Sequence, residues 1–236
     1  MDRQDQLLEK EDGRFYAIDK FGTGLASIAT SERLNKKIVS FGLPSGPALF
    51  LHLAHCAYTK IKDLDPISLF DQHPQGIWPD DQRRLFDFFE DFISHVVFSF
   101  TALEAFANEV IPKEFKYTFK VEKTGEERTY AKEEIERRIN LDEKLGTVLP
   151  RVFAVPSPKG LQVWESYKSI KQTRDRIVHL KSIDMRPSDP EDKTIWGTAL
   201  RMHNQPFCDY AHAMIGHFKP AIASRRYYRK YPYARS

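Results

Sequence analysis

The chain has 236 residues with a formal net charge of +3, and 41% of them are hydrophobic, including 17 Phe and 10 Tyr. This length and composition allow one sizeable hydrophobic core. Cys56 and Cys208 are the only cysteines, which excludes a disulfide framework. No apolar run is long enough to span a membrane, and no signal-peptide pattern is present, so we expect a cytoplasmic protein with no membrane partner.

Residues 1–79 are expected to form an N-terminal extension that is mostly helical, and no role is assigned to it. The first twelve residues are polar and predict a short helix or a frayed start. Residues 14–24 favour a short strand that ends in a glycine-containing turn. These glycines lack the strand, lysine and helix of a phosphate-binding loop, so they do not indicate a nucleotide site.

The rest of this extension predicts two helices and a loop. Residues 31–42 have the spacing of a capped helix that starts at Ser31 and ends at Gly42. Residues 48–60 predict a buried helix. Residues 63–79 contain three prolines and predict a loop at a domain boundary.

Three potential metal ligands, His52, His55 and Cys56, lie on the predicted helix 48–60. Imidazole and thiolate groups bind zinc, and histidines three residues apart share one helix face. No second pair of ligands follows at a recognisable spacing, and histidines in apolar helices are usually packed or hydrogen-bonded. We therefore expect no metal and no cofactor, and a metal enzyme remains a rival interpretation.

Residues 80–111 predict the longest helix of a bundle, which we place at residues 80–224. Apolar residues alternate in steps of three and four along it and form a stripe too wide for one partner helix to cover. Glu104 lies at the edge of this stripe, with Asn108 one turn later. Glu104 is either solvated there or the buried partner of an arginine elsewhere in the bundle.

Between this helix and the next long one, aromatic and charged residues alternate on both sides of Lys123-Thr124-Gly125. This pattern predicts a β-hairpin near residues 115–131, inserted between bundle helices. Short helices are expected at 130–138 and 142–153. The predicted fold class is therefore mainly α: an antiparallel helical bundle with a small β-hairpin insertion and an N-terminal extension.

Residues 164–182 predict the helix around which the bundle is arranged. Its buried stripe contains Tyr167, Ile170, Ile177 and Val178, and position 174 on that stripe is an arginine. Because a guanidinium keeps its charge, this position requires a carboxylate, a ligand phosphate or a wet cleft, unless the side chain reaches solvent along its own stem.

His179 follows near the end of the same helix. Asp175, four residues earlier, could hydrogen-bond the imidazole, fix its tautomer and raise its basicity, as proton transfer near neutral pH requires. The alternative is purely structural, because the helix macrodipole favours a histidine at a C-terminus.

After this helix we expect a loop at 185–193 and a last helix at 206–223, kinked at Pro220. Residues 225–236 form a tail with five basic and no acidic residues, so the rest of the chain has a net charge of +3 − 5 = −2. Basic residues interleaved with four tyrosines suit RNA phosphates and stacked bases, although a solvated or partner-bound terminus is the alternative.

The residues Arg174 to His179, RDRIVH, resemble the Rx4-6H motif of the HEPN superfamily, a group of helical-bundle proteins. A second stretch, SFTALEAFANEVI at 99–111, resembles the earlier HEPN helix that carries a polar residue facing this motif. Together they cover roughly residues 80–182. Many HEPN proteins are metal-independent endoribonucleases that act as toxins or in defence against phage.

The resemblance implies a homodimer in which two motif helices face each other and form a composite RNA-cleaving site. Arg174 and His179 would be catalytic, Asp175 would orient the imidazole, and Glu104 with Asn108 would hold Arg174. Arg176 and Lys181 are the expected RNA contacts. An antitoxin or defence-system protein is a further expected partner. The alternatives are a non-catalytic HEPN-like dimerisation or adaptor module and a nucleotide-binding module.

Overall fold

The computed structural model describes most of the chain. The described residues are 12–19, 25–27, 29–70, 82–121, 124–189, 191–223 and 225–233. The helix or frayed start expected for the first residues lies almost wholly outside them. None of the helices in the described part combines the length and apolar character needed to cross a membrane.

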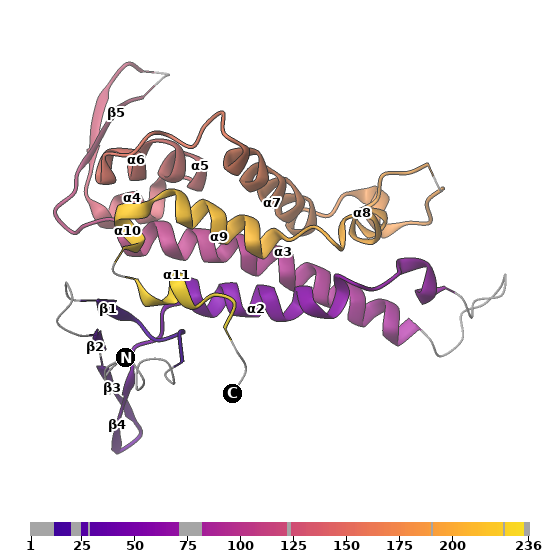
Figure 1. The fold of residues 1–236 in the computed structure, drawn as a ribbon. Coiled ribbons are helices and arrows are strands. Elements are labelled where there is room, and N and C mark those ends of the chain that lie inside the picture. Colours follow the sequence, from indigo (N-terminus) through magenta and orange to yellow (C-terminus); the bar gives the residue numbers. More distant parts are fainter. Residues whose placement is uncertain are drawn as a thin grey trace.

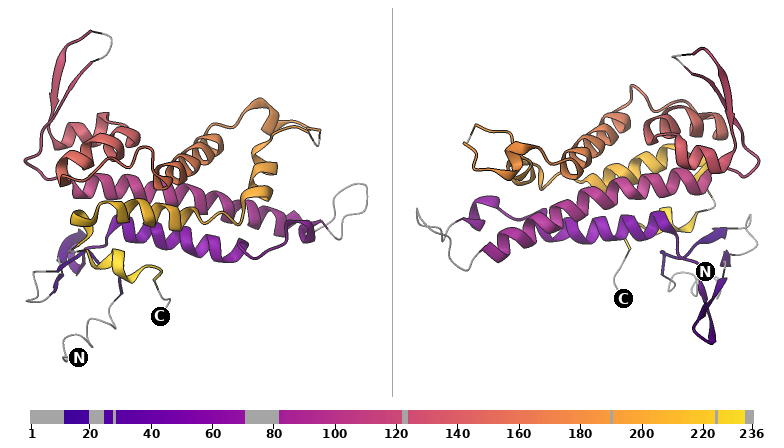
Figure 2. Two further views of the ribbon diagram at one scale, coloured as in Figure 1. Left: turned by 45° about the horizontal axis from the view of Figure 1, so that its top comes forward. Right: turned by 180° about the vertical axis from the view of Figure 1, so that it is seen from behind.

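Four helices form the bundle, and each runs antiparallel to the one before it (Figure 1). They are α2 (Gly46–Ile61), α3 (Gln82–Val110), α7 (Gln162–Val178) and α9 (Phe207–His217). α3 spans the length of the molecule, with α2 on one side of it and α7 on the other (Figure 2). The predicted fold class, a mainly α antiparallel bundle, is confirmed.

Shorter helical elements connect and cap these four. They are η1 (Pro66–Leu69), α4 (Lys132–Arg138), α5 (Leu141–Glu143), η2 (Lys144–Val148), α6 (Leu149–Phe153), η3 (Ser182–Met185), α8 (Ile195–Met202), α10 (Lys219–Ile222) and α11 (Arg226–Lys230). The segment η2 is π-helical and joins α5 to α6 without a break. The expected break near Pro220 is present, because α9 ends at His217 and α10 begins at Lys219.

Three two-stranded antiparallel sheets lie outside the bundle. β5 (Tyr117–Lys120) and β6 (Glu127–Tyr130) form the hairpin predicted between bundle helices, and Gly125 in its turn has a φ of +67°. β1 (Ala17–Asp19) pairs with β2 (Leu25–Ser27). The last pair is β3 (Ala29–Leu34) with β4 (Lys37–Gly42).

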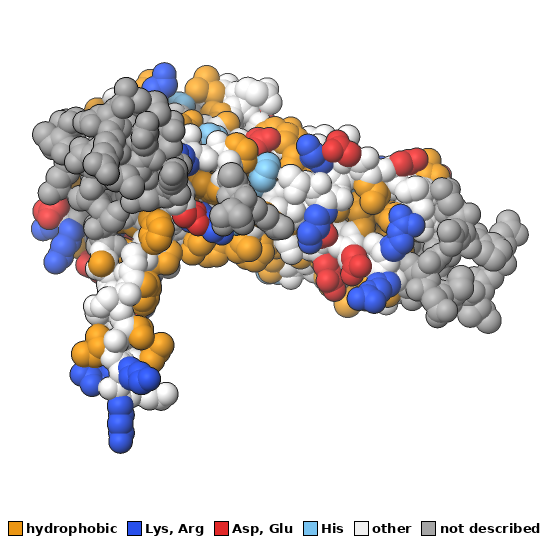
Figure 3. Space-filling view, turned by 60° about the horizontal axis from the view of Figure 1, so that its bottom comes forward, with side chains coloured by type: hydrophobic (Ala, Val, Ile, Leu, Met, Phe, Trp, Pro, Cys, Tyr) orange, Lys and Arg blue, Asp and Glu red, His pale blue; other side chains and the backbone are white. Residues whose placement is uncertain are grey.

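The helix predicted at 31–42 is wrong, because these residues form the β3–β4 hairpin. Leu34 pairs with Lys37, which leaves a two-residue turn in which Asn35 adopts a φ of 55°. Asparagine tolerates this left-handed conformation better than most residues. The hairpin projects from the body of the molecule (Figure 3), so it buries no apolar face that could have marked it in the sequence.

The hydrophobic core lies between α3 and the three helices around it. The predicted seam of α3 is buried from Phe92 to Val110, including Val96, Leu103 and Phe106. The buried polar residue His95 ties three elements together, because its Nδ1 lies 3.1 Å from the Ala54 carbonyl and its Nε2 accepts from the Phe207 amide at 3.1 Å.

The bundle begins earlier in the chain than residue 80. α2 packs along α3, and its residues Ala48, Leu51 and Ile61 belong to the same core cluster as the later helices. The expected mostly helical extension at 1–79 is therefore corrected in two respects. Its described residues 17–42 form strands, and its helix α2 is one of the four bundle helices.

The C-terminal tail is also corrected. Tyr227 and Tyr233 are only 1% and 6% exposed, and Tyr231 donates a hydrogen bond to Asp209 Oδ1 at 2.8 Å. These tyrosines fold back onto α2 and α9, so they are not available to stack on RNA bases. Aromatic rings pack into the core where neighbouring helices offer an apolar surface. The sequence of the tail does not show that such a surface lies beside it.

Candidate functional site

Arg174 lies near the C-terminal end of α7, where this helix crosses α3. Its guanidinium carbon is 4.8 Å from the centre of the Phe100 ring, a cation–π contact. Nη1 donates to Asp175 Oδ1 at 3.0 Å, and 30% of the side chain is exposed. Within the described residues no other group accepts from this guanidinium, so most of its five N–H donors remain available.

His179 is the residue at which α7 ends. Its φ of −113° and ψ of 71° are not helical, although its backbone amide still donates to the Asp175 carbonyl at 3.0 Å. The side chain is exposed, and its ring has no hydrogen-bond partner in the part of the chain that the structure describes. The imidazole is therefore accessible to a ligand or to a second protein chain.

The expected contact between Asp175 and the His179 ring does not form. The carboxylate of Asp175 instead binds Arg174. The prediction assumed that helical geometry continues through residue 179, but the helix ends one residue before, and the imidazole leaves the face that Asp175 occupies.

Glu104 and Asn108 do not hold Arg174 either. No ion pair joins Glu104 to Arg174 among the described residues, and Asn108 Oδ1 accepts from Lys144 Nζ at 2.8 Å. Lys144 is 5% exposed and also donates to the Glu136 carbonyl at 2.9 Å. Burial lowers the pKa of Lys144, whereas the Glu104 and Glu136 carboxylates act in the opposite direction.

Glu104 and Asn108 thus do meet a cation, but it is Lys144 of η2 rather than Arg174. The sequence pattern did not indicate this, because Lys144 lies in a short, charged segment far from Asn108 in the chain. The two hydrogen bonds of this buried lysine connect η2 to α3 and to α4.

A second polar cluster lies at the middle of α7. Asp142 accepts hydrogen bonds from Tyr167, from Lys168 at 3.0 Å and from Lys171 at 2.8 Å. Burial raises the pKa of Asp142, but the hydrogen bonds from Lys171, Tyr167 and Lys168 outweigh it and lower the pKa to about 2. This cluster anchors α7 to α5.

Arg176 is not available to bind RNA, contrary to expectation. Its guanidinium forms two hydrogen bonds with Asp184, one of them from Nη2 to Oδ1 at 2.6 Å. The side chain of Asp184 is 0% exposed, and it also accepts from the backbone amides of Lys181 and Ile195. The bond from Arg176 is the main reason why the pKa of Asp184 lies well below its usual value.

The Arg176–Asp184 pair fixes the turn that follows α7. Trp196 of α8 donates from Nε1 to the Asp184 carbonyl at 2.8 Å, so α8 is attached to the same point. Lys181, the other expected RNA contact, is exposed beside this turn.

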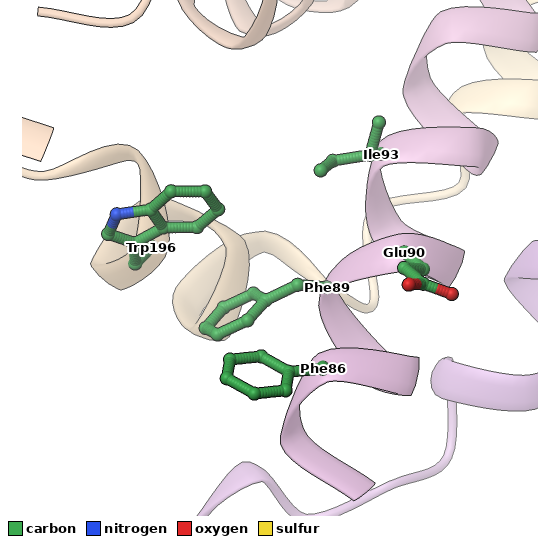
Figure 4. Close-up of a pocket in the computed structure, with 5 residues that line it drawn as sticks. All are labelled: Phe86, Phe89, Glu90, Ile93 and Trp196. Atoms are coloured by element: carbon green, nitrogen blue, oxygen red, sulfur yellow. The ribbon is translucent and has the colours of Figure 1, made fainter. Parts of the chain in front are cut away.

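An apolar hollow of about 400 Å³ lies between α3 and α8 (Figure 4). It is lined by Phe86, Phe89, Glu90, Ile93 and Trp196. Among the described residues of the lining, Glu90 alone is charged, and its negative charge does not suit a phosphate group. The hollow therefore offers no support for the nucleotide-binding alternative.

No protein-family model, no curated protein and no solved structure matches this chain.

Proposed function

We propose that this protein is a metal-independent endoribonuclease of the HEPN type that acts as a homodimer, with Arg174 and His179 as catalytic residues. The observation that carries the proposal is the open end of α7. There, a partly exposed arginine and an exposed histidine both have hydrogen-bonding capacity that no described residue of the chain uses.

The chemistry follows from what these two side chains can do. His179 removes the proton from a ribose 2′-hydroxyl, the 2′-oxygen attacks the adjacent phosphorus, and the bond from phosphorus to the 5′-oxygen breaks. Arg174 binds the non-bridging phosphate oxygens through its remaining N–H groups as negative charge develops on them. The products are a 2′,3′-cyclic phosphate and a 5′-hydroxyl.

One histidine cannot serve as base and acid at once, and the second proton comes from His179 of the partner copy. Two exposed apolar residues flank His179 and support a protein contact at this end of α7: Val178 is 50% exposed and Leu180 is 43% exposed. Exposed apolar side chains that cluster in this way are typical of protein interfaces.

The supporting residues are revised from the sequence-based assignment. Asp175 holds the Arg174 guanidinium rather than the imidazole, and Phe100 supports its flat face. Glu104 and Asn108 stabilise the bundle through Lys144. Lys181 is retained as an RNA contact, and Arg176 is not. The substrate is single-stranded RNA or an RNA loop, where the 2′-hydroxyl can align with the bond that breaks.

The test is incubation of the purified full-length chain with total RNA in EDTA, comparing the wild type with His179→Ala and Arg174→Ala. Arg137→Ala is the matched control, because Arg137 is an exposed arginine on α4. We expect the wild type and the control to cleave RNA, and the two site variants to keep their fold and dimer but lose cleavage.

Expression in bacteria gives a second readout, because a toxin or defence nuclease slows growth and either site substitution relieves it. If the wild type forms a dimer but never cleaves RNA, the chain is a HEPN-like dimerisation or adaptor module instead. Cleavage that survives both substitutions would show that the activity does not depend on the motif.

A further inference from the structure

A group of potential metal ligands lies on the side of the bundle opposite to α7. His55 belongs to α2, whereas Cys208 and Asp209 lie at the start of α9. One ring nitrogen of His55, the Cys208 sulfur and one Asp209 oxygen all lie within 4.8 Å of one another. The three side chains therefore converge from two helices that are far apart in the sequence.

The hydrogen bonding of His55 is incomplete in this position. Its Nδ1 is buried and has no hydrogen-bond partner among the described residues. Buried polar atoms are almost always paired, because leaving one unpaired costs the desolvation of that group. A histidine with an unpaired buried ring nitrogen, placed beside a thiol and a carboxylate, suits metal coordination.

We propose that His55, Cys208 and Asp209 bind a divalent metal ion of the zinc class. Imidazole nitrogen, thiolate and carboxylate oxygen are the three ligand types that zinc accepts in proteins, and three protein ligands leave one position for water. When the ion binds, the Cys208 thiol releases its proton to the solvent and the sulfur coordinates as a thiolate.

The surroundings of the site also fit this assignment. Tyr231 donates a hydrogen bond to Asp209 Oδ1 at 2.8 Å, and its ring makes an edge contact with His55 at 5.6 Å between centroids. A hydrogen bond to a ligating carboxylate orients it toward the metal.

A bound ion would cross-link two helices of the bundle, with its fourth position open to water. It would connect α2 with α9, and through Tyr231 it would hold the C-terminal segment against both. Histidine side chains reach the surface on this face of the molecule (Figure 3). These ligands belong to α2 and α9, whereas Arg174 and His179 lie at the end of α7, so the proposal rests on other residues than the RNA cleavage described above.

His52 and Cys56 provide a matched comparison on the same helix. The Cys56 sulfur lies 3.6 Å from His52 Nε2, but no third ligand of the described chain joins them. This pair should not hold an ion tightly. Cys56→Ser is therefore a control for Cys208→Ser.

The experiment uses the full-length chain after dialysis against a chelator, titrated with Zn²⁺ by calorimetry and with Co²⁺ by absorption. We expect one ion per chain, a thiolate-to-cobalt charge-transfer band, and a melting temperature that rises with Zn²⁺ concentration. Cys56→Ser should behave like the wild type. Cys208→Ser should lose the charge-transfer band, and Asp209→Asn and His55→Gln should weaken zinc binding by about tenfold or more.

Because Cys208 is fully buried, circular dichroism checks that its serine variant is folded. Asp209→Asn changes an exposed residue and remains informative if Cys208→Ser unfolds. The proposal is overturned if the wild type binds no zinc, or if the cobalt charge-transfer band is lost in Cys56→Ser and kept in Cys208→Ser. It is also overturned if the wild type binds the ion without a thiolate band, because surface histidines alone would then account for the binding.

Discussion

In the middle of α7, Tyr167, Lys168 and Lys171 all donate to one carboxylate, Asp142. At the C-terminal end of the helix, Arg174 binds only Asp175 and Phe100 within the described chain, and the His179 ring binds none of its residues. The polar groups around Asp142 are satisfied within the chain and serve stability. Arg174 and His179 keep hydrogen-bonding capacity for a ligand, which is what a site for RNA requires.

This comparison also separates two neighbouring arginines. Arg174 makes one hydrogen bond to an exposed aspartate, whereas Arg176 makes two to the buried Asp184. Both belong to the motif stretch, and in the sequence either could bind phosphate. Their contacts assign Arg174 to the proposed chemistry and Arg176 to the fold.

The largest expected effect concerns catalysis at the open end. His179→Gln should lower kcat for RNA cleavage by about 100-fold or more with a smaller change in KM, because glutamine cannot transfer the proton. Arg174→Lys should keep part of the activity, since lysine retains the charge but not the paired donors. Equal kinetics for His179→Gln and the wild type would contradict the assignment of His179.

The next effect tests the contrast between the two arginines. Arg176→Ala should lower the free energy of unfolding by about 3 kcal/mol, because it leaves the buried Asp184 carboxylate without its partner. Arg174→Ala should lower it by less than about 1 kcal/mol, as expected for a partly exposed pair. Urea unfolding measures both, and similar losses would remove the distinction.

A pH series tests the hydrogen-bonded cluster that Asp142 forms with α7. The folded pKa of Asp142, about 2, lies below its usual value of 3.8, so its contribution to stability is complete above pH 3.8 and is lost as the pH falls through about 2. Asp142→Asn should cost about 1 to 2 kcal/mol at pH 7, after allowance for solvent screening. The difference between the two proteins should shrink below about pH 4. A difference that is constant over this range would contradict the proposed ion pairing.

The smallest effect is expected at Asp175. Asp175→Asn removes the charge beside Arg174 and should change the free energy of unfolding by less than about 1 kcal/mol, because both side chains are partly exposed. RNA cleavage should fall only a few-fold if Phe100 alone keeps the guanidinium in place. A loss as large as that of His179→Gln would instead show that Asp175 itself takes part in proton transfer.

The sequence predicted the parts of this molecule that depend on helical periodicity. The steps of three and four along α3 identified its buried seam. The same spacing located α7, with Tyr167 and Ile170 buried as predicted, but Val178 of the predicted stripe is 50% exposed. The β5–β6 hairpin was predicted because its alternating pattern flanks a glycine that adopts a positive φ. Each of these features is encoded within one continuous stretch of residues.

The wrong predictions concern two kinds of contact. Some contacts join residues that are far apart in the sequence, and one depends on where a helix ends. Asn108 meets Lys144, which is 36 positions away and lies in a π-helical segment that no spacing rule indicates. The Asp175–His179 contact failed because α7 ends one residue too early. His55 likewise finds Cys208 and Asp209 only through the packing of α2 on α9.

The most direct test of the contrast within α7 is the affinity for a single-stranded RNA in which every 2′-hydroxyl is methylated, so that binding is measured without cleavage. Fluorescence anisotropy would compare the wild type with Arg174→Ala and Lys171→Ala. Each variant removes one positive charge from α7, the first at its open end and the second in the Asp142 cluster. We expect Arg174→Ala to weaken binding by about tenfold and Lys171→Ala to leave it unchanged. Equal losses in both variants, or unchanged binding in Arg174→Ala, would contradict the account.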